Sequence, residues 1–316
     1  MSYSSEDFAN YADLIGLSSP ALVEKDYYVV EMLRAIQDYS HSDVEVVFGG
    51  GTSIAKMVSN IDRMSEDVDI KLAFKPSDEV RSRGQEKRIL KEVGSDLLEL
   101  ITQENLSLSD SKKRNEYKYQ IYEITYPQDQ GQDSALRSNI KLELSNTPLF
   151  GQEPIAYPID SLIAKYSRSS SGVTMLCSNL ELTAAEKLIS LLRKTAASRF
   201  EGADDDLTLV RHAYDLFVLD EENSVSWSNV NSIAREVLDY DAEKFRRQIP
   251  ELGIDPTNEL QVGLGMLNNN EYFQKRYDDF LKPLVFRVDP PTWMESLGLI
   301  NTLSRQLISP STLLKP

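Results

Sequence analysis

The sequence predicts an α+β protein, with a mixed sheet flanked by helices in its first half and an α-helical domain in its second half. Three observations support this prediction. A short β-branched run, Val44–Phe48, stops at a glycine turn. Two later segments, Asp67–Phe74 and Asn139–Ser145, alternate apolar and polar residues with the period of a two-faced strand. From about Thr183 onward, apolar residues instead recur at helical spacing.

The same reasoning places the remaining elements. Helices are predicted at Ser19–Asp38, where Pro20 suits the first turn, at Thr52–Ser59 and at Asp78–Gln103, and a strand is predicted at Tyr117–Tyr126. No element is predicted for the polar, basic stretch Leu106–Glu116. The serine-rich segment Ser167–Gly172 is the predicted hinge between a first domain of residues 1–168 and a helical domain of residues 169–316.

Length and composition are those of an ordinary globular protein. The chain has 316 residues, 41% of them apolar, which is enough core material for two packed domains. A single cysteine excludes a disulfide framework and a thiolate metal cage, and two histidines exclude a histidine-rich metal site. The N-terminal segment lacks a signal-peptide pattern, and no run of about 18 apolar residues occurs. We therefore expect a cytoplasmic protein that does not span a membrane.

The charge balance is the main argument against a nucleic-acid substrate. Fifty acidic residues against 34 basic ones give a formal net charge of −16, so the long-range field should repel polyanions. Metal ions or a local basic face would offset this repulsion. Candidates for such a face are Lys71, Lys75, Arg81, Arg83, Lys87, Arg88, Lys91, Lys112, Lys113 and Arg114. Their interleaving with acidic residues favours ordinary solvated positions over a binding face.

Asp67 and Asp69 are the central candidates for chemistry. Two carboxylates separated by one residue lie on the same face of a strand, close enough to bind one or two Mg²⁺ ions. Ions held there bridge the phosphates of a nucleotide and lower the pKa of an attacking hydroxyl. Glu143, on the other alternating segment, is predicted to supply a third metal-binding carboxylate.

The glycine turn before these aspartates suits a triphosphate. Backbone N–H groups at Gly50 and Gly51 can approach phosphate oxygens, the following helix N-terminus adds a partial positive charge, and Thr52 adds a hydroxyl. Each piece has a structural alternative, because Asp-x-Asp triplets occur on solvated strand faces and triple glycines form simple tight turns. Their order resembles the polymerase-β-like nucleotidyltransferase core, and the spacing fits neither a P-loop nor a dinucleotide-binding fingerprint.

The chain also resembles a known family, the AbiEii/MenT nucleotidyltransferases, which are toxins of bacterial toxin–antitoxin and phage-defence systems. The resemblance covers most of the sequence, and its most specific part is RMSEDVDI (Arg63–Ile70). The other matching segments are VEKDYYV (Val23–Val29), FGGGTSIAK (Phe48–Lys56), AEKLISLLRK (Ala185–Lys194) and RHAYDLFVL (Arg211–Leu219).

The resemblance implies transfer of a nucleoside monophosphate from a nucleoside triphosphate (NTP), with Mg²⁺ as cofactor, tRNA as acceptor and a possible antitoxin protein as partner. It implies Lys187 as the nucleotide-contacting lysine and Asp215 as the late acidic residue of the site. From the residues alone, a solvent-facing side chain is the simpler interpretation of Lys187. Asp215 has apolar neighbours and needs a partner, for which Arg211, four residues earlier, is the local candidate. The resemblance adds Lys187 and a metal-bound phosphate as competing partners.

Other residues near these motifs have two interpretations. Arg63 and Ser65 precede the aspartates and are candidates for contact with the triphosphate, but Arg63 pairing with Glu66 is equally compatible. Lys25 is better explained by a helix that packs on the core than by a role in the site. His212 stands where the family often has an aspartate, so it is assigned no role.

Three functions are compatible with the sequence. The first is a nucleotidyltransferase that acts on the 3′ end of tRNA and so blocks translation. The second is nucleotidylation of a protein hydroxyl, for example on an antitoxin, which the acidic charge suits better. The third is a non-catalytic, nucleotide-binding interaction module. The presence of both aspartates, the glycine turn and Lys187 favours an enzyme.

Overall fold

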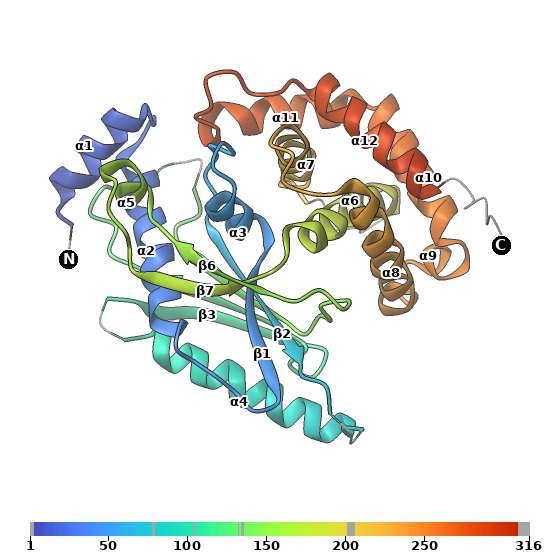
Figure 1. The fold of residues 1–316 in the computed structure, drawn as a ribbon, viewed down its shortest axis with the longest axis horizontal. Coiled ribbons are helices and arrows are strands. Elements are labelled where there is room, and N and C mark those ends of the chain that lie inside the picture. The colour runs from blue at the N-terminus through green and yellow to red at the C-terminus, as the bar shows by residue number, and fades with distance from the viewer. Residues whose placement is uncertain are drawn as a thin grey trace. The chain divides into compact units, whose positions relative to one another are not determined.

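The computed structural model describes residues 3–77, 80–103, 105–131, 133, 136–200 and 206–308 (Figure 1). The chain divides into two compact units, Met1–Asn179 and Leu180–Pro316. This division lies further along the chain than residue 168, because the segment after the serine-rich stretch still forms a strand of the first unit's sheet. Among the described residues, no helix combines the length and the apolar character needed to cross a bilayer.

The first unit is built around one mixed sheet. Its described elements are α1 (Ser5–Ile15), α2 (Pro20–Ile36), β1 (Val44–Gly49), α3 (Gly50–Met57), β2 (Asp67–Phe74), α4 (Arg83–Ile101), β3 (Ser107–Arg114), β4 (Tyr119–Thr125), β5 (Ile140–Ser145), β6 (Ile155–Ile159), α5 (Leu162–Ser167) and β7 (Val173–Cys177). The strand order is β3-β4-β5-β2-β1-β7-β6. Strand β2 is therefore central, antiparallel to β1 on one side and parallel to β5 on the other.

One face of this sheet is apolar and packs against helices. The buried side chains of β2 and β5, such as Val68, Ile70 and Leu142, join those of α2 and α4 in a single core cluster. Burial of these alternate residues fixes the register, since a one-residue slip would turn the apolar set out of the core. The intervening residues of β2 and β5 must then face the other side of the sheet, and these are the charged ones.

The predicted α+β class and its main elements are confirmed. Strand β2 has the predicted bounds, and β1, β4, β5, α2 and α3 lie within a few residues of theirs. Strand β3 was missed because SLSDSKKR has no apolar alternation, and its residues are nearly all exposed. Strand β7, which is not predicted from the sequence, has a period-2 pattern in which Val173, Met175 and Cys177 are buried.

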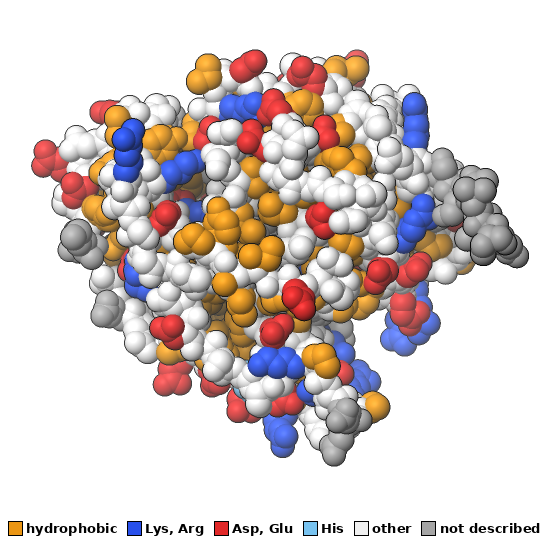
Figure 2. Space-filling view, in the orientation of Figure 1, with side chains coloured by type: hydrophobic (Ala, Val, Ile, Leu, Met, Phe, Trp, Pro, Cys, Tyr) orange, Lys and Arg blue, Asp and Glu red, His pale blue; other side chains and the backbone are white. Residues whose placement is uncertain are grey.

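The candidate basic face is not uniformly basic. On the side of the molecule in Figure 2, Lys and Arg side chains are interspersed with Asp and Glu. Arg81 pairs with Asp43 at 3.1 Å, and Arg83 pairs with Glu116 at 2.6 Å. Lys71 is buried and donates to the Ser178 hydroxyl, so the interpretation as a solvated position is wrong for this residue.

The second unit is helical, as predicted. Its described helices are α6 (Leu180–Ala197), α7 (Arg211–Glu221), α8 (Trp227–Phe245), α9 (Pro250–Ile254), α10 (Pro256–Asn269), α11 (Glu271–Leu284) and α12 (Trp293–Ile308). Helix α10 lies directly on α6 at Gly263, where a Cβ atom would come within 2.1 Å of the Leu192 carbonyl oxygen. The absence of a side chain at this position allows the two backbones to approach.

Two glycines of α10 test this packing. Gly263→Ala is expected to lower the free energy of unfolding by about 1–3 kcal/mol, because the obstructing atom belongs to the backbone and cannot rotate away. Gly265→Ala, two residues along the same helix with nothing within 4 Å of its Cβ, should be neutral or stabilise by up to about 1 kcal/mol. Thermal and denaturant unfolding measure both. Equal effects of the two changes would contradict the close approach.

Candidate active site

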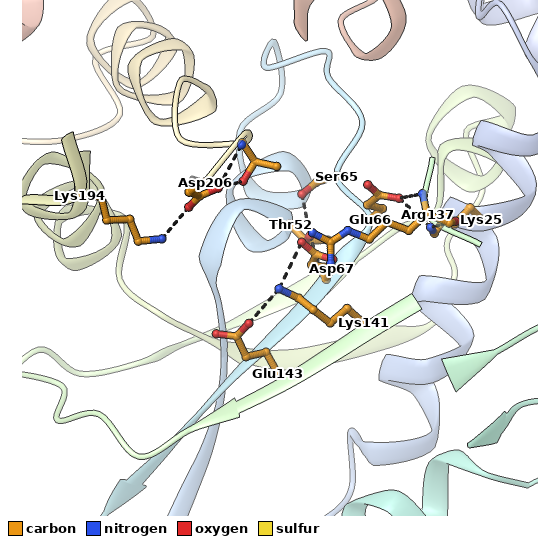
Figure 3. Close-up of polar contacts among 11 residues, drawn as sticks. Lys25, Thr52, Ser65, Glu66, Asp67, Arg137, Lys141, Glu143, Lys194 and Asp206 are labelled. Carbon is orange, nitrogen blue, oxygen red and sulfur yellow. Dashed lines mark hydrogen bonds and ion pairs between the residues drawn. The ribbon is translucent and has the colours of Figure 1, made fainter. Parts of the chain in front are cut away.

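The non-core face of β2 and β5 carries five charged side chains, Asp67, Asp69, Lys71, Lys141 and Glu143. Figure 3 shows Asp67, Lys141 and Glu143. In the parallel register, Asp67 lies opposite Lys141 and Asp69 lies opposite Glu143. Because side chains alternate along a strand, residues two apart emerge on the same face. The predicted common orientation of Asp67 and Asp69 follows from this register, and so does the place of Glu143 beside them.

Asp67 is a largely buried carboxylate with one oxygen that lacks a hydrogen bond. Its side chain is only 24% exposed, and its Oδ1 atom is buried without a hydrogen-bond partner. Two cations approach the carboxylate, with Lys141 Nζ 3.9 Å from Oδ2 and Arg137 Nη1 4.0 Å from Oδ1. A buried carboxylate oxygen that lacks a hydrogen bond is costly unless positive charge compensates it.

Lys141 is bound more tightly to Glu143 than to Asp67. Its Nζ lies 2.9 Å from Glu143 Oε2. Burial acts to lower the pKa of Lys141, but the charges of Asp67, Glu143 and Asp69 together outweigh it and raise that pKa.

Tyr119 is a further titratable neighbour of Glu143. Burial raises the pKa of its hydroxyl, and the charge of Glu143 and a hydrogen bond to it act in the same direction.

The three carboxylates do not form a ready-made metal cage. In the described part of the chain, no three His, Cys, Asp or Glu side chains are grouped so that they could hold a metal ion. Lys141 pairs with Glu143 instead. The role of Glu143 as a third metal ligand therefore stays a prediction. Sequence reasoning missed Lys141, although its spacing of two residues from Glu143 already places it on the same strand face.

The glycine turn closes around Asp69. Gly49 is the register partner of Asp69, and Gly50 has φ +70°, a left-handed conformation that side chains disfavour. A Cβ atom on Gly50 would lie 1.9 Å from Asp69 Oδ2. Only glycine satisfies both conditions here, so the turn and the carboxylate form one compact unit at the start of α3.

Thr52 and Ser65 join α3 to the start of β2. Thr52 is fully buried; its hydroxyl lies 2.8 Å from Ser65 Oγ and donates to the main-chain carbonyl of Asp67. Arg63 is also buried and donates to the carbonyl oxygens of Gly51 and Met64. In this structure, these three side chains fix the backbone around the glycine turn. Glu66, the alternative predicted partner of Arg63, is paired with Lys25.

The second unit contains a buried ion pair. Lys187, on α6, is 6% exposed, and its Nζ lies 2.8 Å from Asp215 Oδ2 on α7. The interpretation of Lys187 as a solvent-facing lysine is therefore wrong. Of the candidate partners of Asp215, Lys187 forms an ion pair with it. The same Nζ is 3.3 Å from His212 Nδ1.

His212 lies among charged side chains. Burial lowers its pKa well below the ordinary value, and the positive charges of Lys187 and Lys194 act in the same direction. The carboxylates of Asp215 and Asp206 oppose this shift without cancelling it. His212 is therefore neutral at neutral pH, and its Nδ1 can accept a hydrogen bond from the Lys187 ammonium.

Comparison with known proteins identifies the family of this chain. Residues 33–298 match the family model described as the nucleotidyl transferase AbiEii toxin of a type IV toxin–antitoxin system. The chain belongs to this family. It is therefore a nucleotidyltransferase toxin by family membership, and the resemblance inferred from its motifs is confirmed.

A solved structure supports the same fold. The protein is similar to MenT4, a nucleotidyltransferase toxin from Mycobacterium tuberculosis H37Rv, with a TM-score of 0.55 and 16% identity. The match covers 98% of this chain and all of the other. At this identity, the likeness supports the fold alone. No curated protein matched the sequence.

The residues present fit the divalent metal that AbiEii nucleotidyltransferases imply. The observation that decides this is the buried Asp67 Oδ1, which lacks a hydrogen-bond donor, next to an Asp69 carboxylate that the Gly50 turn encloses. Carboxylate oxygens are the ligands that Mg²⁺ prefers. Asp67 and Asp69 are thus the residues that would hold it.

The fit of Gly50 around Asp69 is directly testable. Gly50→Ala is expected to lower nucleotidyl transfer about 100-fold, because the new methyl group strains the turn and displaces the Asp69 carboxylate. Gly84→Ala is the control, since nothing lies within 4 Å of its Cβ. Activity and melting temperature are measured for both. An active, normally folded Gly50→Ala variant would disprove the enclosure.

Stability should fall in mild acid because of His212. The unfolded chain binds a proton near pH 6.5, whereas the folded His212 resists protonation, so the unfolded state binds more protons below that pH. Between pH 7.5 and 5.5, this group should remove about 1 kcal/mol from the free energy of unfolding. His212→Gln should flatten that part of the pH profile in urea unfolding. A parallel profile for the two proteins would show that His212 titrates normally.

Proposed function

We propose that this protein transfers a nucleoside monophosphate from an NTP to the 3′ end of tRNA, and so blocks translation, as the toxin of a toxin–antitoxin or phage-defence system. The observation that supports it best is the Asp67–Asp69 pair, held on one strand face beside the Gly50 turn. Family membership supports nucleotidyl transfer itself. The tRNA acceptor, the dependence on Mg²⁺, the cytoplasmic location and an antitoxin partner are our extensions of it.

In this proposal, each part of the site has a separate task. Asp67 and Asp69 would hold Mg²⁺, and the chemistry that such an ion would supply is neutralisation of phosphate charge and a lower pKa of the attacking hydroxyl. Backbone N–H groups of the Gly50–Gly51 turn and the N-terminus of α3 receive the triphosphate, with Thr52, Ser65 and Arg63 as neighbouring candidates for contact. Glu143 is proposed as a third acidic metal ligand. This role requires the ion pair between Lys141 and Glu143 to break.

Lys187 and Asp215 are assigned by the family resemblance. The proposal gives Lys187 contact with the nucleotide and gives Asp215 the task of holding the lysine ammonium. The 2.8 Å ion pair and the His212 acceptor support a lysine whose position and charge are fixed. A buried lysine with a partner on each side loses little conformational freedom when it binds a phosphate.

A protein hydroxyl is the second candidate acceptor. The formal net charge of −16 and the mixing of acidic with basic side chains in Figure 2 offer a long polyanion little electrostatic attraction. A protein acceptor, such as an antitoxin, would avoid this repulsion. In either reaction the acceptor hydroxyl loses its proton and attacks the α-phosphate, the bond between the α- and β-phosphates breaks, and pyrophosphate leaves. The protein acceptor would use a serine, threonine or tyrosine hydroxyl in place of the ribose 3′-hydroxyl.

A labelling assay separates these acceptors. The protein is incubated with Mg²⁺, total tRNA and each of the four NTPs labelled at the α-phosphate. We expect label on tRNA from one or two NTPs, and no label on tRNA whose 3′-terminal diol has been oxidised. Asp69→Asn should reduce labelling about 1000-fold through loss of metal binding. Asp110→Asn, on the exposed strand β3, is the matched carboxylate control.

Each outcome has a clear meaning. Label on a protein instead of tRNA would favour the second acceptor. No label with any NTP, together with equal growth of cells that express wild type or Asp69→Asn, would favour a non-catalytic binding module and would reject the proposal.

A further inference from the structure

The VEKDYYV motif places three consecutive charged residues in the interior. Glu24, Lys25 and Asp26 of α2 are 0%, 0% and 4% exposed. Isolated buried charges are strongly unfavourable, so each of these residues requires a partner. Burial lowers the pKa of Lys25, and the charge of Glu66 opposes that shift. The partners of the triplet lie in four segments of the first unit: the connection between β4 and β5, the residue before β2, α3 and α5.

Two members of the triplet hold the connection between β4 and β5. The Glu24 carboxylate accepts the main-chain N–H groups of Asp129 and Gln130, at 2.9 and 3.1 Å. Lys25 Nζ donates to the carbonyl oxygen of Arg137 at 2.6 Å. A single helical turn of α2 therefore fixes this connection at two separate points.

Arg137 is held on both sides of its backbone. Lys25 Nζ also donates to Glu66 Oε2 at 2.7 Å, and the same Oε2 accepts the Arg137 N–H at 2.9 Å. The buried Lys25–Glu66 ion pair thus binds both polar backbone groups of one residue (Figure 3). Glu66 immediately precedes Asp67, so the ion pair links the position of Arg137 to the start of β2.

The side chain of Arg137 reaches the candidate active site. Its Nη1 lies 4.0 Å from Asp67 Oδ1, and 46% of the side chain is exposed. A guanidinium that only neutralised Asp67 would be expected to form a short, bidentate pair with it. The longer distance and the exposure leave N–H donors available to an incoming anion beside Asp67.

We propose that Arg137 binds the triphosphate of the NTP beside Asp67, and that the Lys25–Glu66 ion pair is the positioning device that holds it there. This rests on the proposed function, because it requires an NTP at the Asp67–Asp69 site. Arginine presents a planar set of donors that matches phosphate oxygens, and a fixed backbone reduces the entropy lost on binding.

The molecule contains a matched control for this device. Asp26, the next residue of the motif, pairs with Lys56 at 2.5 Å and accepts the Leu162 N–H. The Asp26–Lys56 pair is buried to a similar extent as Lys25–Glu66. It joins α2 to α3 and α5 and makes no contact of its own with the Arg137 backbone. Its removal should cost stability without altering the contribution of Arg137 to binding.

The test measures equilibrium binding of the full-length protein to a non-reacting α,β-methylene NTP and to inorganic tripolyphosphate, with Mg²⁺ present. Arg137→Gln should weaken both by about 10- to 100-fold, and Arg137→Lys should recover part of the loss. The clamp variant Lys25→Met/Glu66→Gln should weaken binding about 10-fold when Arg137 is present. It should add nothing further in the Arg137→Gln background, because the positioned side chain is already gone.

The control variant Asp26→Asn/Lys56→Met should show no such coupling to Arg137→Gln. Equal binding by wild type and Arg137→Gln would overturn the inference, as would additive losses for the clamp variant and Arg137→Gln. If the clamp variant does not fold, the Arg137 variants decide alone, since they change only a half-exposed side chain. Absence of NTP binding by the wild type would instead reject the proposed function, and this inference with it.

Discussion

The pairing of β2 with its two neighbours is the constraint on which the site depends. Val68 and Ile70 must be buried against α2 and α4, so Asp67 and Asp69 have to emerge on the opposite face. The antiparallel pairing with β1 then puts Gly49 beside Asp69, and the parallel pairing with β5 adds Lys141 and Glu143. A shift of one residue would bury the carboxylates and expose the apolar residues, so core packing and site geometry are set together.

In the first unit, nearby cations compensate the negative charge of the site's carboxylates. The carboxylates of Asp67, Asp69 and Glu143 repel one another, and Lys141 and Arg137 supply nearby positive charge. These cations differ in how they are held. Lys141 lies on the sheet beside its partners, whereas the backbone of Arg137 is fixed by the buried ion pair between Lys25 of α2 and Glu66, the residue before β2. Such a site can balance its own charge and still leave donors for an anionic ligand.

In the second unit, a neutral histidine takes part in a charged cluster. His212 occupies a position where an aspartate would add a second negative charge beside Lys187. A neutral acceptor leaves Asp215 as the only carboxylate with an ion pair to Lys187 among the described residues. The ammonium is therefore oriented by two groups but neutralised by only one. With one neighbouring carboxylate instead of two, the Lys187 ammonium would attract a phosphate more strongly.

The sequence by itself determined the α+β class, the glycine turn, the strand β2 and the common orientation of Asp67 and Asp69, because these depend on local period and spacing. It also supported the family through contiguous motifs. The sequence did not predict strand β3, because an exposed edge strand needs no apolar alternation. Only the tertiary structure decided that Lys141 pairs with Glu143, that Lys187 is buried against Asp215, and that Lys25 and Glu66 hold Arg137. Those contacts join residues from separate elements, and their partners follow from the packing of the whole unit.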